Sequence, residues 1–239
     1  MSGELVLSLF PGIGLFDRAF EEEGFTVVRG PDVLWGGDVR RFSSPAGVFD
    51  GVIGGPPCQP FSRLVHMVRA NGYEPRHHNL IPEFERIVAE ADPSWFVMEE
   101  VPEAPKPHVQ GYAVVQVKLN NRWIGGEQDR CRVFSFGTTN GTMLHPDVAI
   151  FESQRWAPAV TASTGGGKIN RKKDQRFSEA LRLQGLPPDF LSEAPFTATG
   201  KHHVVGNGVP LPLGRAIARA VRRAMGLPLL DHAEAGEVA

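Results

Sequence analysis

Residues 5–14 of the chain read LVLSLFPGIG, an apolar run that ends in a turn with two glycines. The run Leu5–Leu9 has the length and character of a strand that is buried on both faces. Gly12 and Gly14 follow it, and Leu15–Glu23 then has the apolar stripe of a helix. Glycines at such a junction let the backbone bend and approach a ligand. The stretch therefore predicts the opening strand–turn–helix unit of an α/β fold.

The remainder of the chain continues this alternation of apolar runs and amphipathic helices. A second helix is predicted over Leu80–Ala91 and a last one from about Leu213 to Met225. The alternation predicts a doubly wound α/β sheet, and the Gly-, Thr-, Asn- and Pro-rich region after Thr138 predicts a small irregular second lobe. The predicted strands are Leu5–Leu9, Phe25–Val28, Gly51–Ile53, Trp95–Met98, Ala113–Leu119 and Cys131–Phe136.

Length and composition limit the class of protein. With 239 residues the chain can form one large domain, and a net charge of −2 means that any nucleic-acid surface must come from local clustering. The two cysteines form neither a disulfide framework nor a zinc spacing, so we expect a cytoplasmic protein without a metal ion. Pro11 and Gly12 interrupt the first apolar run, which argues against a signal peptide or a membrane span. A basic cluster, interpretable as a solvated face or a phosphate-binding one, comprises Lys168, Arg171, Lys172, Lys173, Arg176 and Arg182.

The glycine turn by itself is a weak indication of a nucleotide site. The dinucleotide fingerprint fails because Asp17 stands where a third glycine is needed, and TGGGKI fails as a phosphate loop because it ends in Ile169. Asp32, 18 positions after Gly14, strengthens the case, since an acid there can hold a ribose hydroxyl. Asp38 could accept from an exocyclic amine. The combination favours an adenosine-containing cofactor, and S-adenosyl-L-methionine fits this description.

The only other cysteine besides Cys131 lies in the loop GGPPCQPFS. Cys58 follows an apolar strand, so we expect it at the carboxyl edge of the sheet, where ligands bind in this architecture. Pro56, Pro57 and Pro60 fix the backbone around it and stiffen the loop. Cys58 is therefore a candidate nucleophile, and because a free thiol has a pKa of roughly 8.5 it needs partners.

Candidate partners stand at other strand ends. Glu99 and Glu100 end a buried strand, and adjacent like charges are costly unless each has its own partner, which favours a functional interpretation. Gln128 precedes an alternation that would point Arg130 and Arg132 to the same face, where they could hold a planar base or a phosphate.

These motifs, in this order, resemble the cytosine-5 DNA methyltransferase family over nearly the whole chain. The matching segments are SLFPGIG (Ser8–Gly14), Asp32 with GDV (Gly37–Val39), GGPPCQPFS (Gly54–Ser62), EEV (Glu99–Val101), QDRCR (Gln128–Arg132), RFSEALRLQGLPPDF (Arg176–Phe190) and VGNGVP (Val205–Pro210). The resemblance implies a Rossmann-like methyltransferase sheet.

The resemblance also implies a mechanism on a cytosine that is flipped out of a DNA duplex. The thiolate of Cys58 adds to carbon 6 of the ring, which makes carbon 5 nucleophilic toward the methyl group. Glu99 meets the charge that develops at nitrogen 3, Arg132 bonds the cytosine oxygen, and Arg130 and Gln128 support the loop.

The same resemblance assigns binding residues and partners. S-adenosyl-L-methionine is the implied methyl donor, DNA the implied substrate, and the chain is expected to act as a monomer. Residues expected to line the cofactor site are Phe10, Gly12, Ile13, Gly14, Asp32, Val33, Asp38, Val39, Pro57, Asn207 and Val209. Residues expected to contact DNA are Gln59, Ser62, Lys168, Arg171, Lys172, Lys173 and Arg176. The last helix is expected to pack beside the first.

Three positions and one region depart from the family pattern. Ser8 replaces the usual Asp, Leu15 a common Gly and Glu100 the usual Asn. Only about 18 residues, Thr138–Arg155, remain for target recognition. We therefore expect short or relaxed sequence specificity, with phosphate contacts dominating affinity. The expected organisation is a catalytic domain of residues 1–137 plus 204–228, a small DNA-contacting lobe of residues 138–203 and a flexible tail of residues 229–239.

Three alternatives stay open. The substrate could be tRNA, which a relative of this family methylates with the same residues. The chain could be a catalytically weak nucleic-acid-binding relative. It could also be a thiol enzyme unrelated to nucleic acid, although the pairs His77-His78 and His202-His203 are expected in polar surface loops rather than beside Cys58.

Overall fold

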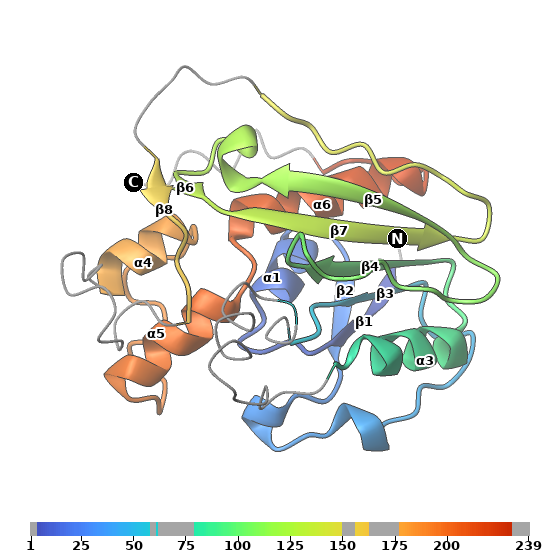
Figure 1. Cartoon of the computed structure of the whole chain (residues 1–239), viewed down its shortest axis with the longest axis horizontal. Helices are drawn as coiled ribbons and strands as arrows, with labels where there is room; N and C mark the ends of the chain where they lie inside the picture. The colour runs from blue at the N-terminus through green and yellow to red at the C-terminus, as the bar shows by residue number, and fades with distance from the viewer. Residues whose placement is uncertain (1–3, 58–60, 62–78, 150–155, 163–176, 231–239) are drawn as a thin grey trace.

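The computed structural model describes residues 4–57, 61, 79–149, 156–162 and 177–230, and within them one six-stranded sheet forms the centre of the molecule (Figure 1). Its strands are β1 (Leu5–Leu9), β2 (Thr26–Arg29), β3 (Gly51–Gly54), β4 (Trp95–Glu100), β5 (Ala113–Asn120) and β7 (Cys131–Thr138). They lie in the order β2-β1-β3-β4-β7-β5, and the pairings among β1, β2, β3 and β4 are all parallel. The predicted α/β sheet is therefore confirmed.

The direction of β7 was not predicted. This strand runs antiparallel to both β4 and β5. The chain leaves β5 through a 3-10 helix, η3 (Asn121–Ile124), passes the short strand β6 (Gln128–Asp129) and enters β7 at once. So short a return can join only antiparallel strands, because a parallel neighbour needs a crossover of a dozen or more residues.

Helices cover both faces of the sheet. On one face, α1 (Leu15–Glu22) and α6 (Leu211–Ala224) pack against the apolar side chains of β3, β4 and β7, and on the other α3 (Ile81–Ala91) packs against those of β1, β3 and β4. The predicted contact between first and last helices is confirmed, since a Cβ added to Gly214 would lie 2.6 Å from the Cβ of Ala19. The last helix of the chain, α6, therefore packs against the first, α1.

Two further helices stand at one end of the molecule, α4 (Phe177–Leu183) and α5 (Ala198–Asn207) (Figure 1). They share a third apolar cluster with Leu15 and Ala19 of α1. Beside them β6 pairs with β8 (Ala157–Pro158). The placement of His202 and His203 in a loop was wrong, because both lie within α5 and the ring of His202 is 5.1 Å from that of Phe177.

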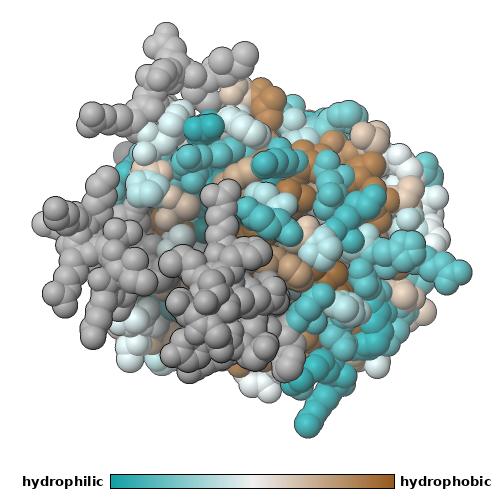
Figure 2. All heavy atoms as spheres, viewed as in Figure 1, coloured by the Kyte–Doolittle hydropathy of each residue, from teal (hydrophilic) through white to brown (hydrophobic). Residues whose placement is uncertain are grey.

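The surface of the described residues is mainly polar in the view of Figure 2, with an apolar patch over the β5–β7 part of the sheet. None of the helices in the described part of the chain has the length and apolar character needed to cross a membrane. Between the end of β7 and residue 149 the chain is irregular, as predicted.

Candidate active site

The turn between β1 and α1 is open on its backbone side. Gly12 and Gly14 have φ values of 56° and 78°, which L side chains rarely adopt. The amide of Gly12 donates to Asp32 Oδ2 at 2.8 Å, and Oδ1 accepts from the amide of Leu34 at 2.7 Å. A Cβ added to Gly12 would meet no atom within 4 Å. Asp32 therefore fastens a turn that leaves room for a ligand at backbone level.

A buried polar network holds the same turn from below. Ser8 Oγ donates to Asp17 Oδ1 at 2.5 Å, and Arg29 Nε pairs with Asp17 Oδ2 at 2.9 Å. Burial is the main cause that raises the pKa of Asp17. The guanidinium of Arg29 also lies against Gly14, where an added Cβ would be 2.6 Å from Nη2. The departure at Ser8 is thus accompanied by a carboxylate from α1, a pairing that no sequence motif indicated.

Asp38 stands beside this turn with its carboxylate engaged. Its two oxygens accept from Nε and Nη2 of Arg40, each at 2.9 Å, and this pairing lowers the pKa of Asp38. From the sequence we predicted that Asp38 accepts from an exocyclic amine, and no motif indicated Arg40 as its partner. Its role toward a ligand stays a prediction.

A pair of aromatic side chains, one exposed and one partly buried, borders the turn. Trp35, at the end of the 3-10 helix η1 (Val33–Trp35), donates Nε1 to the carbonyl of Gly12 at 2.7 Å. Its ring is 5.9 Å from that of Phe196, and the side chain is 60% exposed. Sequence reasoning missed both aromatics, because neither lies in a motif.

The segment after α5 reaches the turn from the other end of the chain. A Cβ on Gly208 would lie 2.5 Å from Leu15 Cδ1, at the first residue of α1. The fold therefore brings the predicted cofactor residues of the first and last motifs together. Of the others, Phe10 and Ile13 lie in the turn, Val33 begins η1, Val39 begins η2 (Val39–Arg41), Pro57 follows β3, Asn207 ends α5, and Val209 is buried beyond it.

Glu99 and Arg132 form a half-buried ion pair at the ends of two adjacent strands. Glu99 Oε1 lies 2.8 Å from Arg132 Nε, with 11% and 16% of the two side chains exposed. In the antiparallel pairing of β4 with β7, Glu99 is directly opposite Phe134, and Arg132, two residues earlier in β7, lies diagonally across from Glu99 on the same face of the sheet. A Cβ added to Gly55 would lie 3.1 Å from Glu99 Oε2. The carboxyl group of Glu99 therefore lies next to Gly55, three residues before Cys58.

Arg130 does not lie beside the Glu99–Arg132 ion pair. It is 2% exposed, and its guanidinium donates to the carbonyls of Val160 and, at 3.1 Å, Gly208. The expectation that Arg130 and Arg132 hold a base or phosphate on one face was therefore wrong for Arg130, because β7 begins only after it, at Cys131. The geometry is that of a support for the loops around the site.

Two buried glutamines extend this support. Gln128 donates to the carbonyl of Leu183 and to Gln184 Oε1 at 2.6 and 3.0 Å, and accepts from the amide of Val160 at 3.0 Å. Gln184 donates in turn to the carbonyl of Val205 at 2.6 Å. These amides join β6, β8 and the VGNGVP segment. Gln184 is a supporting residue. In the sequence it was only part of the RFSEALRLQGLPPDF motif, and no role was predicted for it.

Several predicted site residues lie outside the described part of the chain. They are Cys58, Gln59, Ser62, Lys168, Arg171, Lys172, Lys173 and Arg176. Their roles stay predictions.

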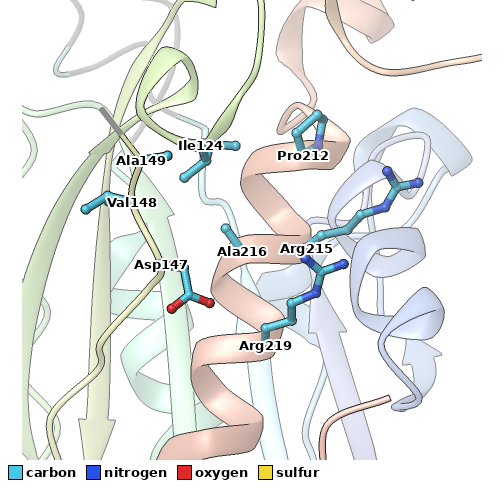
Figure 3. Close-up of a pocket in the computed structure, with 8 residues that line it drawn as sticks. All are labelled: Ile124, Asp147, Val148, Ala149, Pro212, Arg215, Ala216 and Arg219. Carbon is cyan, nitrogen blue, oxygen red and sulfur yellow. The ribbon is translucent and has the colours of Figure 1, made fainter. Parts of the chain in front are cut away.

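A separate groove of about 320 Å³ lies between α6 and residues 147–149 (Figure 3). Arg215 and Arg219 stand on its α6 side, but their guanidinium groups pair with Glu22 and Glu23 at 2.6 and 2.9 Å. None of its lining residues is a predicted site residue. The groove is therefore distinct from the candidate active site.

Comparison with known proteins agrees with this geometry. Residues 36–165 match the sequence profile of the C-5 cytosine-specific DNA methylase family. Among similar proteins, Type II methyltransferase M.HgiDI of Herpetosiphon aurantiacus is 30% identical over 182 residues, which are 63% of this chain and 57% of the relative. M.FnuDI of Fusobacterium nucleatum is 32% identical over 161 residues, 55% of this chain and 46% of the relative. The chain thus spans about half the length of the curated relatives it matches.

Solved structures share the fold. Entamoeba histolytica methyltransferase EhMeth superposes with a TM-score of 0.65 at 12% identity, covering 94% of this chain and 99% of that one. A DNMT2 mutant of Spodoptera frugiperda superposes with a TM-score of 0.62 at 13% identity, covering 93% and 100%. The order of motifs, the sheet that gathers them and the matched family profile lead to one conclusion: this chain belongs to the C-5 cytosine-specific DNA methylase family.

Proposed function

We propose that this chain transfers a methyl group to carbon 5 of a cytosine in DNA. The observation that carries the proposal is the Glu99–Arg132 ion pair, which stands against Gly55 at the entrance to the Cys58 loop. The pair offers a carboxyl group and a guanidinium side by side, the two groups needed to bond nitrogen 3 and the oxygen of one cytosine. An extruded cytosine placed there would have its ring beside the loop that carries the thiol.

The proposed chemistry divides one difficult substitution into two easier steps. The Cys58 thiolate would add to carbon 6, and the electron pair of the ring double bond would then form the bond from carbon 5 to the methyl group, whose bond to the donor sulfur breaks and leaves its electron pair on that sulfur. Glu99 holds a proton at nitrogen 3, which limits the negative charge on the ring. Loss of the carbon-5 proton to a base restores the double bond and expels the Cys58 thiolate.

The open turn fits S-adenosyl-L-methionine, which supplies an electrophilic methyl group when bound. The space beside Gly12 admits a ligand at backbone level, and the Asp32 carboxylate at its edge can accept from a ribose hydroxyl. Exposed apolar side chains of η1 offer an adjacent surface for a planar base, with Val33 77% exposed. In this proposal the glycine turn, Asp32 and η1 hold the ligand at the edge of the sheet, beside the cytosine.

Relaxed recognition is part of the proposal. The stretch Thr138–Arg155 is too short for an elaborate base-reading lobe, so phosphate contacts by Lys168–Arg176 would supply most of the affinity. Bisulfite sequencing of a plasmid modified in cells should therefore show methylation in many contexts. Methylation confined to one recognition sequence of about four or more bases would contradict the proposal of relaxed recognition.

Covalent trapping tests the proposed function. Incubation with S-adenosyl-L-methionine and duplex DNA that contains 5-fluorocytosine should give a stable adduct, because fluorine cannot leave carbon 5 as a proton does. The adduct should be seen by denaturing electrophoresis and mass spectrometry, and should be absent from Cys58→Ala. Parallel arms with single-stranded DNA and tRNA identify the preferred nucleic acid. If the duplex gives no Cys58-dependent adduct, the proposal is wrong.

Replacing Gly55 by Ala tests the placement of Glu99. The new Cβ would lie 3.1 Å from Glu99 Oε2, so the carboxyl group must shift by a few tenths of an ångström. We expect methyl transfer to fall about tenfold, since small misplacements of a reacting group are costly. Thermal unfolding measured alongside should change little. An unchanged rate in a folded Gly55→Ala protein would show that Glu99 does not act from this position.

A further inference from the structure

Glu100, next to the proposed catalytic acid, is a buried carboxyl group that the mechanism above does not use. It is 2% exposed. Its Oε2 accepts from the amide of Val101, the next residue, at 3.0 Å. Its other oxygen, Oε1, is buried and has no hydrogen-bond partner among the residues the structure describes. A carboxylate in this setting is poorly solvated, which favours the neutral acid.

The residues around Glu100 supply little compensating charge. Val133 of β7 is directly opposite, and Lys118 of β5 is opposite Val133, so these three lie in one row across the sheet. The charged groups around Glu100 are Lys118, farther along the same row, and Glu99 and Arg132, whose side chains lie on the other face of the sheet. In the described part of the chain no ion pair joins either cation to Glu100, and Arg132 is bound to Glu99. Among these described residues, Glu100 therefore has no cation paired with it.

The titration of Glu100 follows from this geometry. Burial, followed by the negative charge of Glu99, raises its pKa from 4.5 to about 8, while the Val101 amide and Arg132 lower it only in part. At neutral pH Glu100 is therefore mainly the neutral acid, and of the two adjacent side chains only Glu99 is paired with Arg132.

We propose that Glu100 is a positioning residue: its neutral carboxyl group leaves the Glu99–Arg132 pair on the other face of the sheet undisturbed, and its ionisation in alkaline solution adds a second negative charge next to Glu99 that perturbs this pair and switches the site off. The step is a loss of one proton to solvent. The effect on catalysis rests on the proposed function, whereas the buried neutral acid can be tested without any substrate.

The first test is the pH dependence of unfolding for the wild type and Glu100→Gln. Because the folded-state pKa lies above the unfolded one, the unfolded chain loses this proton first, and stability should fall as the pH rises from about 4.5 to about 8. Gln keeps the shape and the acceptor for Val101 but cannot ionise. Its melting temperature should exceed that of the wild type above neutral pH by on the order of 5 °C. Parallel curves for the two proteins would overturn the inference.

The second test is the pH–rate profile of methyl transfer. One pH unit above the ionisation, wild-type kcat should drop to roughly a tenth of its plateau, whereas Glu100→Gln should stay on its plateau. The matched control is Glu103→Gln, which removes an exposed carboxylate from the adjacent loop and should follow the wild type. If kcat falls at alkaline pH in Glu100→Gln as it does in the wild type, Glu100 is not the switch. Absence of methyl transfer in every protein would instead refute the proposed function, and the unfolding curves would still decide the state of Glu100.

Discussion

Replacing Glu99 by Gln is expected to reduce methyl transfer by roughly 100- to 10,000-fold, the range that a positioned proton-holding group contributes. Gln has the same shape, and its side-chain oxygen can still accept from Arg132 Nε, which lies 2.8 Å from Glu99 Oε1. It cannot carry a proton on that oxygen toward nitrogen 3 of cytosine. The loss should therefore appear in kcat, with cofactor binding unaffected. Single-turnover transfer of a labelled methyl group measures it.

A control separates this effect from the loss of any ion pair. Glu22, the last residue of α1, pairs with Arg215 of α6 and Arg18 of α1 at 2.6 and 2.9 Å, and none of these three is a predicted site residue. Glu22→Gln should keep wild-type kcat. If Glu99→Gln also stays within a few-fold of the wild type, Glu99 does not hold the proton and another group must be sought.

The second large effect concerns stability. Arg130→Met should lower the free energy of unfolding by about 3 kcal/mol, because buried acceptors without a donor cost about 1–3 kcal/mol each. The carbonyl of Val160 loses its Arg130 donor, and that of Gly208 keeps only a longer bond from Gln184, at 3.2 Å. Met preserves most of the side-chain volume, so packing is largely retained. Urea unfolding should show a lower midpoint with an unchanged slope.

Arg122 provides the comparison in the same neighbourhood. Its side chain is 37% exposed and lies 3.9 Å from Asp129. Arg122→Met should change stability by less than about 0.5 kcal/mol, as expected for surface positions. Equal losses in the two variants would show that Arg130 does not hold the loops together.

Particular elements show where sequence reasoning succeeded. Leu5–Leu9 was predicted to the residue, and the helix over 80–91 began one residue later, because apolar periodicity is a property of the local sequence. The last helix begins two residues earlier than predicted, at Leu211, since Pro212 is tolerated in a first helical turn. The direction of β7 was missed, because pattern locates a strand but not its neighbours.

The candidate site divides in the same way. The motifs identified Glu99, Asp32 and Arg132 as residue types suited to the chemistry, and the fold set Glu99 against Arg132. Alternation placed Arg130 with them, and the structure showed it instead bonded to carbonyls 30 and 78 residues away. Spacing along a strand cannot reveal such a partner.

The sequence by itself determined the six strands of the main sheet, the helices α1, α3 and α6, the glycine turn and the order of motifs that marks the family, because these depend on periodicity, turn chemistry and residue type over short stretches. Only the tertiary structure decided which groups are paired. Asp17 pairs with Ser8 and Arg29, Gln128 bonds to Gln184, and one carboxyl oxygen of Glu100 is buried with no hydrogen-bond partner among the described residues. The physical reason is that burial and hydrogen bonding are set by segments far apart in the chain, and in a desolvated setting they decide whether a carboxyl group is charged.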